Sequence, residues 1–123
     1  MTDGIQDKYR QGIIRVLSAH PEVEKAVLFG SRAAGTFRPT SDLDIALFGN
    51  RLTFIEQAKI SLEIEDLDMP QKIDLLIYQK ITSQKLQNHI NKHGVIWYKK
   101  GQPGTVKMVL KQAELVAGEG LPI

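Results

Sequence analysis

Apolar side chains near the start of the chain recur every three or four residues. Ile5, Tyr9 and Ile13 follow this spacing. It predicts a helix over about residues 3–19, because one face of a helix repeats every 3.6 residues. Pro21 helps to end that helix, since the residue before a proline is driven away from helical backbone.

Four short apolar runs, rich in β-branched residues, predict buried strands. They cover residues 25–29, 43–48, 72–78 and 95–98. Two more helices are predicted between these runs. Thr53 can cap a helix that ends near Asp66, with Glu56 at the capping-box spacing. Ser83 can cap another helix, which Gly94 closes.

This alternation of strands and helices predicts the fold class. An α/β (α+β) arrangement is expected, in which helices cover a small mixed β-sheet. The pattern indicates one domain over residues 1–100. A linker begins at Gly101, and the apolar spacing after it predicts a C-terminal helix within residues 101–123.

Composition narrows the class of protein. The chain has 123 residues, of which 42% are apolar and 24% are charged, an ordinary globular balance. A net charge of +2 is too small to argue for direct nucleic-acid binding. There are no cysteines, no signal-peptide pattern and no run long enough to span a bilayer. We therefore expect a soluble cytoplasmic protein with no membrane partner.

Two aspartates at the start of a predicted strand are the first candidate for chemistry. Asp42 and Asp44 are two residues apart. Side chains on a strand alternate between faces, so both carboxylates point the same way. Alone, Ser41-Asp42 is typical of a loop or cap. Two neighbouring carboxylates repel each other, and a divalent cation between them relieves that repulsion.

A third aspartate interrupts the apolar strand at residues 72–78. Asp74 alone could be an exposed edge-strand carboxylate. If its strand pairs with the strand of Asp42 and Asp44, the three carboxylates converge. They could then hold two Mg²⁺ ions, as in sites that activate an attacking oxygen and stabilise a leaving one. We predict such a metal site at Asp42, Asp44 and Asp74.

A glycine–serine pair follows the first predicted strand. Gly30 lets the backbone approach a phosphate closely, and Ser31 can bind phosphate oxygens. Arg32 can neutralise phosphate charge, or form a surface ion pair instead. Alone, Gly30-Ser31 is more typical of a turn. Together with the aspartates, these residues predict a nucleotide-binding site.

These motifs carry a family resemblance. Gly30-Ser31, ten further residues and then Asp42-Leu43-Asp44 resemble the signature of DNA polymerase β-like nucleotidyltransferases. Over about residues 23–100 the chain looks like the minimal nucleotidyltransferase (MNT) branch, including the antitoxins of HEPN/MNT pairs. One departure is Ala34, where many relatives carry a second arginine.

The resemblance implies the polymerase β-like fold and a role for each site residue. Asp42 and Asp44 would ligate both metals. Asp74 would ligate the catalytic metal and help to activate an acceptor hydroxyl, and Ser31 would contact the terminal phosphates. It further implies transfer of AMP from ATP to a tyrosine on a helical HEPN partner.

Two other functions stay open at this point. One is modification of a small molecule such as an aminoglycoside, for which a homo-oligomer could complete the pocket. The other is a non-catalytic module that binds nucleotide or masks its partner. A chain of 123 residues leaves little room for an acceptor-binding domain, which favours an acceptor on another chain.

Several other residues are less informative. His89 and His93 have an i,i+4 spacing that zinc sites use, but no third ligand is evident near them. Trp97 and Tyr98 are expected in the core or an interface.

Overall fold

The computed structural model describes residues 3–101, and its elements follow the predicted ones closely. The helices are α1 (Asp7–Ser18), α2 (Gly30–Ala34), α3 (Phe54–Glu65) and α4 (Gln84–His93). The strands are β1 (Lys25–Phe29), β2 (Leu43–Phe48), β3 (Ile73–Ile77) and β4 (Val95–Lys99), with a 3-10 turn, η1 (Tyr78–Lys80), after β3. The helix expected in the C-terminal segment lies outside the described residues, and the domain division stays a prediction.

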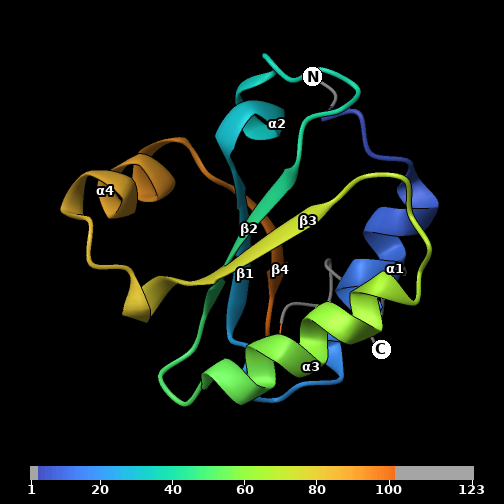
Figure 1. The fold of residues 1–123 in the computed structure, drawn as a ribbon. Helices are drawn as coiled ribbons and strands as arrows, with labels where there is room; N and C mark the ends of the chain where they lie inside the picture. The colour runs from blue at the N-terminus through green and yellow to red at the C-terminus, as the bar shows by residue number, and fades with distance from the viewer. Residues whose placement is uncertain (1–2, 102–123) are drawn as a thin grey trace, which may run out of the picture.

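The four strands form one mixed sheet in the order β3-β2-β1-β4. β1 is antiparallel to both β2 and β4. β2 and β3 are parallel, and α3 makes the crossover between them. This mixed sheet with its covering helices, drawn in Figure 1, confirms the predicted fold class.

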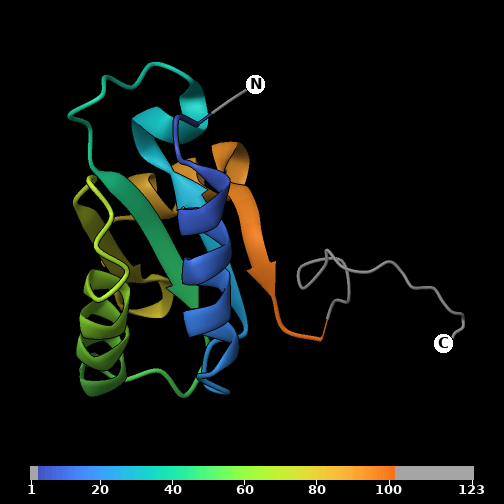
Figure 2. The same cartoon turned by 90° about the vertical axis from the view of Figure 1, so that its right-hand side faces the viewer.

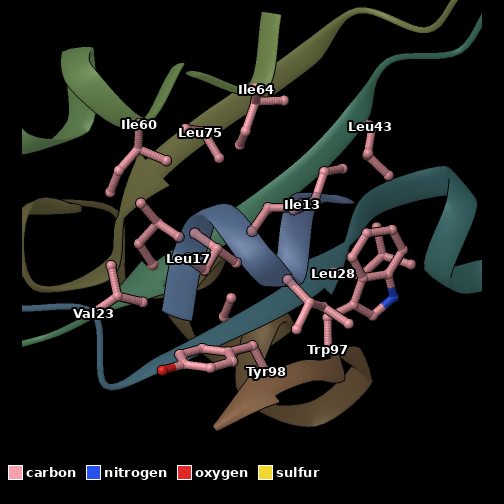
Figure 3. Close-up of a cluster of buried hydrophobic side chains, with 14 of the residues drawn as sticks. Ile13, Leu17, Val23, Leu28, Leu43, Ile60, Ile64, Leu75, Trp97 and Tyr98 are labelled. Atoms are coloured by element: carbon pink, nitrogen blue, oxygen red, sulfur yellow. The ribbon is translucent and has the colours of Figure 1, made fainter. Parts of the chain in front are cut away.

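Helices cover the two faces of the sheet unequally. α1 and α3 lie on one face and α4 on the other, as Figures 1 and 2 show together. The main core lies between the sheet and α1 and α3 (Figure 3). Its buried members include Ile13, Leu17, Leu28, Leu43, Ile45, Ile60, Ile64 and Leu75. A smaller cluster of Val27, Phe29, Ala46 and Ile90 lies on the α4 face.

Capping residues set two of the helix starts. The Thr53 hydroxyl accepts a hydrogen bond from the Glu56 N–H at 3.2 Å, and α3 begins directly after Thr53. The Ser83 hydroxyl accepts one from the Leu86 N–H at 3.1 Å, at the start of α4. Each bond satisfies an N–H group that has no acceptor within its helix.

The first helix starts later than the sequence predicted. Residues 3–6 are not helical, and α1 begins at Asp7. Gly4 has a φ of 77°, which no right-handed helix contains. The Asp3 carboxylate accepts hydrogen bonds from the Ile5 N–H and from Arg10, so the segment folds back on the helix instead of extending it. Within residues 3–101, no helix combines the length and apolarity that crossing a membrane requires.

Candidate active site

Two of the predicted aspartates are direct neighbours in the sheet. Asp44 and Asp74 are each the second residue of their strand, and the parallel register of β2 and β3 pairs them. Asp44 lies between Leu43 and Ile45, which are buried in the main core, so its side chain points to the opposite, α4 face. Asp42 immediately precedes β2, two residues before Asp44, so its side chain is expected on the same face of the sheet. The expected pairing of these two strands is therefore present.

Asp44 is affected by burial and by the charges of the other two aspartates. Burial raises the pKa of the Asp44 carboxyl above its usual value, and the charges of Asp74 and then Asp42 raise it further. Both influences disfavour the ionised form. Such crowding is unfavourable without a counter-charge, and a bound divalent cation supplies one.

Gly30 lies directly against this carboxylate group. Phe29, the last residue of β1, is paired with Asp44 across the sheet, and Gly30 follows it. Gly30 has a φ of 76°, in the left-handed region, and a Cβ at this position would collide with the Asp44 carboxylate oxygen Oδ2. Glycine is thus required both by the turn into α2 and by the approach of Asp44.

Ser31 occupies the next position, in the first turn of α2, where it is partly exposed. N–H groups in the first turn of a helix have no acceptor within the helix. The Ser31 hydroxyl and the backbone near it therefore offer donors beside the aspartates. Ala34 is exposed at the end of α2, and its methyl group offers no such donor.

Arg32 differs from its expected place. Its side chain is only 1% exposed, and its guanidinium lies beneath the loop that leads into β2. It donates to the carbonyl oxygen of Ser41 at 2.9 and 3.1 Å and to that of Asp3 at 2.9 Å. Longer bonds reach the carbonyls of Arg38 and Pro39. These contacts direct the guanidinium toward backbone carbonyls and leave almost none of it accessible to a phosphate.

The contacts of Arg32 reveal a set of residues that sequence reasoning missed. The Phe37 ring lies 4.8 Å from the Arg32 guanidinium carbon. A Cβ on Gly4 would overlap both the Phe37 ring and the Arg32 side chain. The N-terminal segment, α2 and the loop before Asp42 therefore meet at one buried cation. Burial of an arginine has no local sequence signal, so these contacts could not be read from the sequence.

The remaining predicted candidates lie elsewhere. His89 and His93 are exposed on α4, with ring centroids 5.2 Å apart. Trp97 and Tyr98 are 7% and 6% exposed and belong to the main core, as expected.

Comparison with known proteins agrees with this geometry. A family model described as polymerase beta, nucleotidyltransferase, matches residues 11–103. The chain belongs to this family. No curated protein matches the chain.

Solved structures show the same fold in the minimal nucleotidyltransferases. A toxin–antitoxin complex with AMP-PNP is 25% identical, with a TM-score of 0.62 over 75% of this chain and 74% of that one. A complex of the tri-AMPylated HEPN toxin of Shewanella oneidensis with its MNT antitoxin gives 22% identity and a TM-score of 0.58, over 77% and 73% of the two chains. With the family match, these structures confirm the predicted polymerase β-like fold, and one of the relatives that share it is an MNT antitoxin.

Nucleotidyltransferases of this family use divalent metal ions and nucleoside triphosphates, and the donor set fits such an ion. All three candidate ligands, Asp42, Asp44 and Asp74, are carboxylates, and hard cations such as Mg²⁺ prefer oxygen ligands. The raised pKa of Asp44 reports the electrostatic cost that a cation would remove. These residues are therefore the ones that would hold it.

Proposed function

We propose that this nucleotidyltransferase transfers AMP from ATP to a hydroxyl group, with Asp42, Asp44 and Asp74 as its metal ligands. The observation that carries the proposal is the register pairing of Asp44 with Asp74, beside Asp42 and against Gly30. A pure binding module has no need of three neighbouring carboxylates that together disfavour the ionised form of Asp44. Catalysis by two Mg²⁺ ions does need them.

In the proposed reaction the acceptor oxygen attacks the α-phosphorus of ATP. A bond forms between that oxygen and phosphorus, the bond to the β-phosphate oxygen breaks, and pyrophosphate leaves. Mg²⁺ ions supply the charge neutralisation that phosphoryl transfer chiefly requires. Asp74, which is exposed on β3, receives the acceptor proton. Gly30 and Ser31 hold the phosphates of the leaving group through backbone N–H groups and the hydroxyl.

The proposed acceptor is a tyrosine on a HEPN-type helical partner, and this chain acts as the antitoxin. Support comes from the structural relatives: one is a toxin–antitoxin complex holding AMP-PNP, and another contains a tri-AMPylated HEPN toxin bound to its MNT antitoxin. The described domain, residues 3–101, is one small sheet with its helices and contains no separate acceptor-binding domain. An acceptor presented by a second chain is consistent with that size.

The test is a transfer assay with the full chain, Mg²⁺, ATP labelled on its α-phosphate, and the co-purified partner. Wild-type protein is expected to label the partner and to increase its intact mass by whole multiples of AMP. Asp44→Asn and Asp74→Asn remove a ligand charge while keeping side-chain size, and should abolish labelling. Asp66→Asn is the matched control, because Asp66 is an exposed carboxylate at the end of α3.

Two results would overturn the proposal. If Asp44→Asn labels the partner as fast as Asp66→Asn does, the carboxylates are not the catalytic site. If the partner binds and is neutralised without gaining mass, the chain masks its partner without modifying it. Labelling of an added aminoglycoside, with the partner left unlabelled, would favour the small-molecule reaction instead.

A further inference from the structure

A group of side chains of the types that ligate metal ions lies at the end of the sheet opposite the aspartates. His20 follows α1, Glu22 precedes β1, and Glu56 stands in the first turn of α3. One ligand atom from each lies within 4.8 Å of the other two. β1 starts at this end and finishes beside Asp44, so its full length separates the two groups. Nothing in the proposed transfer reaction uses these residues.

The hydrogen bonds of His20 indicate which of its ring nitrogens is available to a metal ion. Its Nε2 lies 3.0 Å from a Glu63 carboxylate oxygen, a good distance for a donated hydrogen bond. A neutral imidazole has one donor nitrogen and one acceptor nitrogen. With Nε2 donating to Glu63, Nδ1 carries a lone pair, and that lone pair faces the Glu56 oxygen Oε1. Two acceptors facing each other need a proton or a metal ion between them.

The spacing between these two atoms favours a metal ion. Nδ1 and Oε1 are 3.4 Å apart. A charge-assisted hydrogen bond from a protonated ring would be shorter, about 2.7–2.9 Å. Two ligands on a tetrahedral zinc ion, with bonds of about 2.0–2.2 Å, lie about 3.3–3.6 Å apart. The observed separation is long for a charge-assisted hydrogen bond and fits two ligands sharing one ion. The three ligand atoms as a set lie within 4.8 Å of one another, so the carboxylates would close in on a bound ion.

The surroundings of the ring also suit a cation. The carboxylates of Glu63 and Glu56 flank the ring, at 3.0 and 3.4 Å from its two nitrogens, so negative charge surrounds it. The side chain of His20 is 12% exposed and that of Glu56 is 22% exposed, so the group is sheltered but reachable. The nearest competing cation is Lys59, whose Nζ lies 3.9 Å from the other Glu56 oxygen and whose side chain is 61% exposed.

We propose that His20 Nδ1, Glu56 and Glu22 bind one divalent transition-metal ion of the zinc type, with water completing the tetrahedron. Glu63 holds the opposite ring nitrogen, which is the arrangement that orients metal-bound histidines in general. The ion would join the α1–β1 turn to α3 across the end of the sheet. Its purpose is structural, since all of its protein ligands lie far from Asp42, Asp44 and Asp74.

The test uses the untagged full chain, stripped with a chelator and kept in excess Mg²⁺ to occupy the aspartate site. Zn²⁺ affinity is measured by competition with a chromophoric chelator, and Co²⁺ is added separately to read coordination from its visible spectrum. We expect one tight Zn²⁺ equivalent, a tetrahedral Co²⁺ spectrum, and a melting temperature that rises by several degrees with Zn²⁺.

Three variants separate the ligands from their surroundings. Glu22→Gln removes one proposed ligand but leaves both His20 hydrogen bonds in place, so it should weaken Zn²⁺ binding without loosening the turn. Glu63→Gln should weaken binding by about 10–100-fold, the usual effect of a lost supporting carboxylate. His93→Gln is the histidine control, because His89 and His93 form the other pair that could capture zinc.

The outcomes are decisive in either direction. Tight binding that His93→Gln retains and Glu22→Gln loses supports the site, even if a His20 variant fails to fold. Tight binding that His93→Gln abolishes places the ion on α4 and overturns the proposal. The proposal is also overturned if Glu22→Gln binds Zn²⁺ as wild type does, or if wild type gives no tetrahedral Co²⁺ spectrum. His20 would then be a protonated histidine that forms ion pairs with Glu56 and Glu63.

Discussion

Replacement of Gly30 by alanine separates backbone strain from damage to the carboxylate group. Gly30 has a φ of 76° and Gly101 has a φ of 82°, so both lie in the left-handed region. An L-residue there costs about 1–2 kcal/mol. Gly30→Ala and Gly101→Ala should therefore lose similar amounts of backbone stability. Since small domains are stable by about 5–15 kcal/mol, both variants should fold.

The two sites differ in what the new methyl group meets. At Gly101 no described atom lies within 4 Å of the position that the methyl carbon would take, whereas at Gly30 the methyl would collide with Asp44 Oδ2. Asp44 must then move away from its place beside Asp74. A displacement of about 1 Å in a catalytic group can lower a rate about 100-fold. We expect that loss in kcat for Gly30→Ala alone.

Two measurements check this reasoning. Urea denaturation gives the free energy of unfolding of both variants, and the partner-labelling assay gives their transfer rates. Equal losses of stability with a rate loss confined to Gly30→Ala are the expected result. If Gly30→Ala transfers AMP as fast as Gly101→Ala, the contact between Gly30 and Asp44 has no part in positioning the carboxylate.

Two further substitutions test the packing of the fold, one beside the site and one in the main core. Arg32→Met keeps an apolar stem but removes every side-chain donor to the carbonyls of residues 3, 38, 39 and 41. It should lower the free energy of unfolding, measured by urea denaturation, by about 3 kcal/mol and remove most of the transfer activity. An unchanged free energy of unfolding would mean that water replaces the guanidinium at no cost. Ile60→Ala opens a cavity in the main core and should cost about 2–5 kcal/mol, whereas Ile55→Ala, at a site 69% exposed on the same helix, should cost far less. Equal losses for the two isoleucine variants would contradict the assigned core.

Local patterns determined much of this protein. Alternation along residues 43–48 was enough to put Asp42 and Asp44 on one face and Leu43 and Ile45 on the other, because the side-chain period of a strand is fixed by its backbone. The caps at Thr53 and Ser83 were readable for the same reason: a cap bonds to an N–H three residues away. The positions of helices and strands, and the shared face of Asp42 and Asp44, thus follow from the local sequence.

Tertiary structure decided the features that join distant segments. The parallel pairing that sets Asp74 beside Asp44 depends on the path of the crossover helix, which no strand pattern specifies. The sequence left Arg32 open between a phosphate contact and a surface ion pair, whereas in the structure its donors bind carbonyls from both the N-terminal segment and the loop before Asp42. His20 meets carboxylates 36 and 43 residues away. Periodicity is a property of the local backbone, whereas burial and charge contact exist only once separate elements have packed together.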